Sequence, residues 1–232
     1  MGLFDRFKKK AAAAGIGVGP AYVYSDQELE EFDAYVERAF GPYDSVLHEI
    51  ASPDIHLDVV IVPPSPGRDH LMLLTMGAGA YRMDVPSQFA KYELEYAEYA
   101  ICLPADWNLE SGDDRDYWPV RLLKDAGRLP VSCDTWLGYG HTMQNDEDGS
   151  PYAPGVGFNS AMLAALPQAD GKVAELRMSN GKLINFYLLL PLYPEELAFK
   201  FEHGADDLID LLAETDGFPV LDVARRNCCA GE

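Results

Sequence analysis

The chain has 232 residues, of which 48% are hydrophobic and 24% charged, a balance typical of a folded protein rather than a disordered one. Acidic residues outnumber basic residues by 38 to 18, which gives a formal net charge of −20. This excess excludes nucleic acid as an expected direct ligand, because phosphate binding requires a basic surface. It favours encounter with basic partners.

The chain is predicted to consist of a flexible leader, residues 1–24, and a single domain, residues 25–232. Glycines and a proline interrupt the small residues that follow the basic stretch of the leader, and no later segment has the composition of a linker. No stretch approaches the roughly 18 to 20 apolar residues of a membrane span. The four cysteines show no CxxC spacing, so we expect a reducing, cytoplasmic setting.

The start of the leader mixes aromatic and basic side chains. Leu3, Phe4 and Phe7 stand beside three lysines at positions 8–10, and such a mixture could touch a membrane surface weakly. A mobile tail is the preferred interpretation.

The first predicted helix begins after Ser25, where Ser25-Asp26-Gln27-Glu28 fits a capping box. Gly41-Pro42 should end it. Its acidic face, with Glu28, Glu30 and Glu31, is expected to stay in water. The apolar stripe should pack on a sheet and consists of Leu29, Phe32, Val36 and Phe40.

Two strands are predicted next, over residues 55–62 and from Leu71, and their short link favours an antiparallel hairpin. The segment from Lys91 mixes helix and strand formers, and we interpret it as a strand. A short helix should follow from Pro119 and end at Gly127.

Residues 138–157 are predicted to form an irregular, exposed acidic loop. Beyond it, Ser179-Asn180-Gly181 separates two strand-like segments, and Asn-Gly supplies the positive φ angles of a tight hairpin. One helix should then run to about His203 with Gly204 as its cap, and another should follow from Ala205. The pattern predicts an α/β (α+β) fold with a central mixed sheet and flanking helices.

Catalytic motifs are weak in this sequence, and no GxSxG nucleophile elbow occurs. His56, Asp58 and His141 could be assembled into a metal site of a hydrolase, but a hydrogen-bonded structural pair of His56 with Asp58 is the preferred interpretation. Gly77-Ala78-Gly79 has two of the glycines of a phosphate-binding turn and is interpreted as a tight turn. We therefore expect no enzyme, no cofactor and no metal, with the metal-dependent hydrolase as the alternative.

Several spaced segments, taken together and in order, resemble the suppressor-of-fused family. They are His56-Leu57-Asp58-Val59 with Val62-Pro63, Leu74-Thr75-Met76-Gly77 with Met83 and Pro86, Tyr92-Glu93-Leu94, Leu103-Pro104-Ala105-Asp106-Trp107, Trp118-Pro119 with Leu122-Leu123, residues 138–141, Ile184-Asn185-Phe186 and residues 191–196. The resemblance spans roughly residues 45–212.

The resemblance implies a mixed sheet with flanking helices and no known catalytic centre. Animal members bind and restrain a transcription factor, and bacterial single-domain members are often immunity proteins that neutralise a toxin domain. We therefore expect a bacterial immunity protein that binds a basic toxin, with a regulatory scaffold without a toxin as a further alternative. The acidic loops supply the predicted contact residues, which are Trp107, Glu110, Asp113, Asp114, Asp116, Asp146, Glu147 and Asp148.

Overall fold

The computed structural model describes residues 22–52 and 54–231, and the predicted leader therefore lies almost entirely outside the described residues. The helices are α2 (Asp26–Phe40), α3 (Asp114–Cys133), α4 (Pro194–His203) and α5 (Ala205–Ala213), with 3-10 turns η1 (Ala78–Ala80) and η2 (Ser87–Tyr92). The strands are β1 (Ser45–Leu47), β2 (Asp58–Val62), β3 (His70–Met76), β4 (Tyr96–Pro104), β5 (Thr142–Gln144), β6 (Ser160–Ala165), β7 (Glu175–Arg177) and β8 (Leu183–Leu192).

The strands form one mixed sheet in the order β1-β2-β3-β4-β8-β6-β5, with β7 paired to β8 off this path. Antiparallel hairpins build β1 to β4, which confirms the predicted pairing of β2 with β3. The only parallel pair of the described sheet joins β4 to β8, with Tyr96 opposite Ile184 and Ala100 opposite Leu188. The predicted fold class, a mixed sheet with flanking helices, is confirmed.

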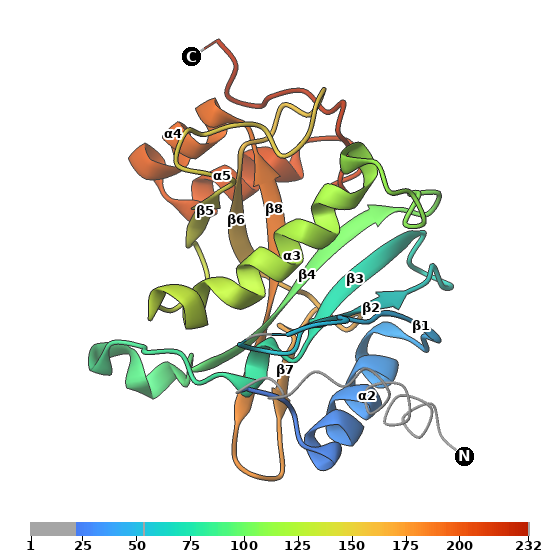
Figure 1. Ribbon diagram of the computed structural model, residues 1–232. Coiled ribbons are helices and arrows are strands. Elements are labelled where there is room, and N and C mark those ends of the chain that lie inside the picture. The colour runs from blue at the N-terminus through green and yellow to red at the C-terminus, as the bar shows by residue number, and fades with distance from the viewer. Residues whose placement is uncertain (1–21, 53, 232) are drawn as a thin grey trace.

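Helices cover both faces of the sheet (Figure 1). On one face α3 crosses β3 and β4 and buries Trp118 completely among apolar side chains of both strands. On the other face α2 packs on β8, where Phe186 contacts the rings of Phe32 and Tyr35, and α4 and α5 add Leu197, Leu208 and Leu212 to the same apolar cluster. Each strand of the centre is therefore apolar on both sides, as in a sheet buried between two layers.

The α2 helix has the predicted capping box, in which the Ser25 hydroxyl accepts from the Glu28 amide and the Glu28 carboxylate accepts from the Ser25 amide. The expectation that Glu28 stays in water was wrong, because the residue is buried. Lys182 Nζ lies 2.7 Å from its carboxylate and Asn180 Nδ2 donates to it at 3.0 Å. Both partners come from the β7–β8 hairpin.

The α3 helix is longer than the predicted segment from Pro119 to Gly127. The Asp113 carboxylate accepts from the Arg115 amide and starts the helix five residues earlier than predicted, and the helix continues through Gly127 to Cys133. Gly127 does not end the helix but lets it approach the sheet, since a Cβ atom there would lie 2.8 Å from Leu57 Cδ1.

Two further predictions needed correction. The strand expected from Lys91 begins only at Tyr96, because η2 and a left-handed Glu93 precede it. The hairpin of β7 and β8 is confirmed, but of its Asn-Gly pair only Gly181 has a positive φ, at 91°. Both helices predicted near the C-terminus are confirmed, with Gly204 between them.

A buried ion pair helps to hold the segment after α5 on the domain. Arg225 donates to both Glu196 oxygens, at 2.5 and 2.6 Å, and to the Pro191 carbonyl at 3.0 Å. The Glu196 side chain is completely buried and also accepts from the Cys228 amide. The guanidinium group lies over the rings of Phe158 and Tyr193.

Candidate protein-binding surface

The two acidic loops chosen from the sequence meet at one end of the molecule. Arg121 of α3 joins them, since one of its nitrogens lies 3.3 Å from the Asp114 carboxylate and another donates to the Tyr152 carbonyl at 2.5 Å. A hollow lies where they adjoin, and it is lined by Trp107, Arg115, Asp116, Pro154, Gly155, Val156 and Val223. The structure therefore brings the segment that follows the acidic tip, with Tyr152 and Pro154, beside the loop that precedes α3.

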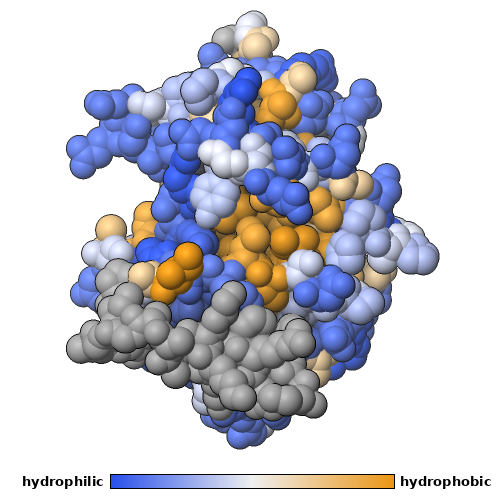
Figure 2. All heavy atoms as spheres, turned by 45° about the vertical axis from the view of Figure 1, so that its right-hand side comes forward, coloured by the Kyte–Doolittle hydropathy of each residue, from blue (hydrophilic) through white to orange (hydrophobic). Residues whose placement is uncertain are grey.

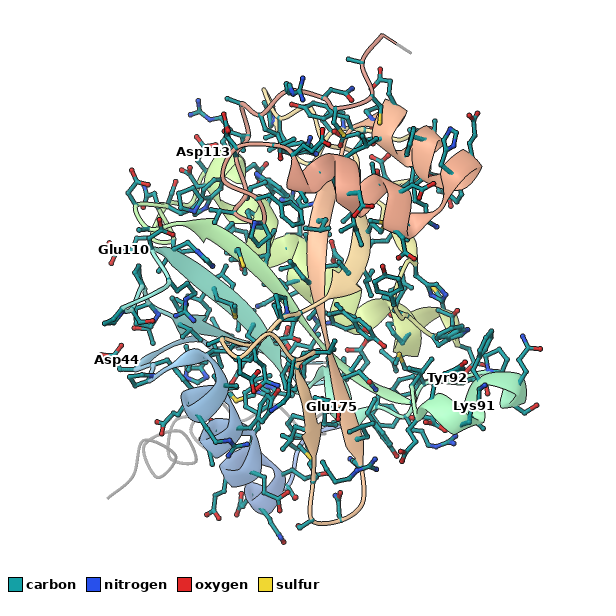
Figure 3. The ribbon with its side chains drawn as sticks, turned by 180° about the vertical axis from the view of Figure 1, so that it is seen from behind. Asp44, Lys91, Tyr92, Glu110, Asp113 and Glu175 are labelled. Carbon is teal, nitrogen blue, oxygen red and sulfur yellow. The ribbon has the colours of Figure 1, made fainter. Side chains whose placement is uncertain are left out.

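The first loop folds over the start of α3. Trp107 is half-buried, and its indole nitrogen donates to the Asp116 carbonyl at 2.8 Å. Asp113 caps the helix and pairs with Arg115, whose hydrogen bonds lower the pKa of the Asp113 carboxyl to about 2. Glu110, Asp113 and Asp114 are exposed, and Figure 3 shows Glu110 and Asp113 on the same side of the molecule.

The second loop differs in part from the prediction for residues 138–157. It contains β5, and it buries Tyr152 against Trp118, with the two rings stacked 5.1 Å apart. Its acidic tip is exposed as expected, at Asp146, Glu147 and Asp148. Asp146 also accepts from the Ser150 amide at 2.8 Å, a bond that lowers the pKa of its carboxyl.

The residues of the alternative metal site do not come together as a triad. His56 Nε2 lies 3.1 Å from Asp58 Oδ1, whereas His141 packs edge-on against the Trp136 ring. The second partner of Asp58 is His48, whose Nδ1 lies 2.8 Å from Oδ2 and which sequence reasoning missed. Among residues 22–52 and 54–231, no group of three or more His, Cys, Asp or Glu side chains has the arrangement of a metal site.

Replacing Asp58 by asparagine should lower the pKa of His56. The hydrogen bond from Asp58 raises the His56 pKa above its usual value, and an amide cannot stabilise the imidazolium in the same way. The stability that protonated His56 contributes is therefore fully present below its pKa in the unfolded chain, about 6.5, and is lost as the pH rises through its pKa in the folded protein. NMR titration of the ring protons measures the change, with His70 as an internal reference that should not move. An unchanged His56 pKa would contradict the assignment.

The Gly77-Ala78-Gly79 turn binds an internal carboxylate instead of a phosphate. The amides of Gly77 and Gly79 donate to Glu98 Oε1 at 2.9 and 3.1 Å. A Cβ atom on Gly77 would lie 2.2 Å from the His56 carbonyl oxygen, so the turn admits only glycine there. The interpretation of this segment as a tight turn is confirmed.

Two hydroxyl groups complete the site of Glu98. Tyr24 Oη donates to Oε1 at 2.7 Å and Thr75 Oγ1 donates to Oε2 at 2.5 Å. Glu98 is completely buried, and this burial outweighs the four donors and raises the pKa of its carboxyl to about 6. Sequence reasoning missed Glu98, because a single acid inside a strand pattern carries no signal of its donors.

The architecture places the chain in the class of α+β domains with a mixed sheet between helices. A family model described as Suppressor of fused protein (SUFU) matches residues 53–226. The chain belongs to the suppressor-of-fused family, whose domains typically bind other proteins. Comparison with curated proteins found no significant match.

Solved structures share this fold. A suppressor-of-fused homologue from Neisseria gonorrhoeae aligns with a TM-score of 0.57 at 17% identity, over 86% of this chain and 95% of that one. A Sufu–Fu complex aligns with a TM-score of 0.55 at 13% identity, over 84% and 86%. Drosophila Suppressor of Fused aligns with a TM-score of 0.56 at 13% identity, and this chain spans 50% of its length. Within the described residues, no helix is long and apolar enough to cross a membrane.

Proposed function

We propose that this chain is an immunity protein that binds and neutralises a basic toxin domain through its united acidic loops, acting in the cytoplasm of a bacterium. The observation that supports the proposal is the position of Arg121, which lies 3.3 Å from the Asp114 carboxylate and donates to the Tyr152 carbonyl. The loop before α3 and the segment that follows the acidic tip are therefore neighbours, and one partner could contact both.

The chemistry of this surface supports a basic protein partner. Its exposed carboxylates would attract a basic domain and speed the encounter, which benefits an inhibitor that must act before the toxin does. The hollow beside Trp107 is lined by aromatic and apolar side chains, such as Trp107 and Val156, next to the charged Arg115 and Asp116. Such a mixture of aromatic centre and charged rim is typical of protein interfaces.

Reversing four of the exposed acids should weaken partner binding by at least tenfold. The set is Asp106→Lys, Glu110→Lys, Glu147→Lys and Asp148→Lys, all exposed positions, which leaves the structural contacts of Asp113, Asp114 and Asp146 in place. Close charge pairs across an interface contribute from about 1.5 kcal/mol upwards, so the loss of several exceeds one factor of ten. The affinity is measured by calorimetry with a partner captured from native cells by pull-down at low salt.

The matched control changes the net charge equally on the other side of the sheet. It consists of Glu30→Lys, Glu202→Lys, Asp207→Lys and Asp210→Lys, all exposed positions of α2, α4 and α5. None of these four residues is in the proposed contact set, and salt screens interactions between exposed charges, so the affinity should change little. Equal losses from both sets would show only a general charge effect. A captured partner that does not kill cells when expressed alone would favour the regulatory scaffold.

A further inference from the structure

The hollow beside Trp107 contains an acid that the fold itself does not use. Asp116, in the first turn of α3, lines the hollow and is half-buried. Its carboxylate makes no hydrogen bond or ion pair with another described residue. Arg115, the basic side chain of the lining, donates to the two oxygens of Asp113 at 3.1 and 2.6 Å, so its charge is already compensated. The hollow therefore retains negative charge.

Aromatic and apolar side chains stand around this acid. The Trp107 indole nitrogen donates to the Asp116 carbonyl at 2.8 Å, which fixes the ring beside the start of α3. Val223 comes from the segment after α5 and is 38% exposed, so its methyl groups can contact a guest. Figure 2 views the side on which α3 begins and shows a mainly hydrophilic surface, with apolar atoms recessed in a hollow. A partner contacts recessed apolar surface with a long side chain that passes the polar rim.

The same chain shows how an arginine is held between aromatic rings and a carboxylate. The Arg225 guanidinium lies 4.8 Å from the centre of the Phe158 ring and 5.0 Å from that of Tyr193. It also donates to both oxygens of Glu196. The hollow offers the same two elements, but no cation of the described residues lies over the Trp107 ring. Tryptophan is the aromatic side chain that attracts cations most strongly, and arginine stacks on rings as well as pairing with carboxylates.

We propose that the hollow is a binding site for an arginine side chain, with the guanidinium group between the Trp107 ring and the Asp116 carboxylate. The aliphatic part of the side chain would pack on Val223. The basic partner would supply this arginine, and in that respect the inference rests on the proposed function. Lysine fits less well, because its compact and strongly hydrated ammonium group does not stack on a ring as a planar guanidinium does.

Titration with N-acetyl-arginine amide, followed by NMR, tests the hollow without any partner. The chain has three tryptophans, and the indole N–H signal of Trp107 alone should shift. Trp118, which is completely buried, and Trp136, which packs on His141, serve as internal references. The citrulline analogue has the same shape without the charge and should bind about fivefold more weakly. Absence of a shift with the arginine probe, or an equal shift with the citrulline or glutamate analogue, would overturn the proposal.

Asp116→Asn should weaken binding of the arginine probe about fivefold, because it keeps the shape of the side chain and removes its charge. Asp207→Asn is the matched control, since Asp207 also lies in the first turn of a helix, α5, and carries the same charge. This control should leave the affinity for the probe unchanged. Equal losses from the two variants would show a general charge effect and refute the site.

Calorimetry with the captured partner separates this inference from the proposed function. Asp116→Asn should also weaken partner binding about fivefold. If the fourfold charge reversal weakens partner binding and Asp116→Asn does not, the interface stands and the arginine site fails. If the arginine probe binds in the hollow and the charge reversal has no effect on the partner, the proposed function fails and the arginine site stands.

Discussion

Replacing Arg225 by alanine should destabilise the protein by about 3–5 kcal/mol, because it leaves a buried carboxylate without its counter-charge. Arg225 makes two hydrogen bonds to Glu196, whose side chain has no solvent exposure, and its own side chain is only 11% exposed. The substitution also frees the Pro191 carbonyl and removes the stacking on Phe158 and Tyr193. Chemical denaturation measures the loss.

Arg177 is a matched control for this prediction. It also donates to both oxygens of one glutamate, Glu93, at 2.7 Å each, but both side chains are about half exposed. Exposed ion pairs contribute only about 0–1 kcal/mol, so Arg177→Ala should be nearly neutral. If the two variants lost the same stability, burial would not be the cause. Glu196→Gln combined with Arg225→Ala should recover part of the loss, because it removes the uncompensated charge.

Replacing Tyr24 by phenylalanine should cost about 1.5–3 kcal/mol, the typical contribution of a hydrogen bond to a charged group. The Tyr24 hydroxyl donates to the buried Glu98 carboxylate, and Tyr24 stands directly before α2. The loss should therefore appear in global unfolding and as faster hydrogen exchange in α2.

Tyr152 is a matched control, because its hydroxyl is buried without a hydrogen-bond partner among the described residues. Tyr152→Phe should therefore be neutral or stabilising.

The pH dependence of the Tyr24→Phe effect distinguishes a charged acceptor from a neutral one. The pKa of Glu98 is about 6 in the folded protein, against a usual value of 4.5, because burial disfavours its charge. The Tyr24 hydroxyl lowers the pKa of Glu98, so the variant should have a Glu98 pKa above 6. The full difference between wild type and variant should therefore appear above the pKa of the variant, shrink as the pH falls towards 6, and stay small below 6, where Glu98 is protonated in both. A difference independent of pH between 5 and 8 would contradict this assignment.

The elements that sequence reasoning predicted correctly are those with short-range signals. Ser25 and Glu28 cap α2 within one turn, Gly181 sits between two strands that pair with each other, and Gly204 ends α4. In each case the residues that decide the structure lie within a few positions of one another. The family resemblance then added the mixed sheet, which no single segment could indicate.

The errors at Glu28, Glu98 and Gly127 have a different physical origin, because each of these residues is governed by contacts between distant parts of the chain. Glu28 is buried since Lys182 arrives from another hairpin, and Glu98 is held by Tyr24 from before α2. The α3 helix passes Gly127 because tertiary packing on Leu57 needs a residue without a side chain. For the candidate surface, the sequence offers the acids only as a prediction, and the contact of Arg121 with Asp114 and the Tyr152 carbonyl could not be foreseen, because it joins segments distant in sequence.

The parallel pair at the centre of the sheet has a consequence for how the chain folds. β1 to β4 are joined by local hairpins, and β6 and β7 both pair directly with β8, so each half can begin to form from nearby residues. The halves meet only when β8 docks beside β4, across an intervening segment that includes α3. Closing so long a loop carries a large entropic cost before the contacts repay it. Synthesis of β8 should therefore be the step that commits the chain to its native structure, with one hydrogen-bonding edge of β4 unpaired until then.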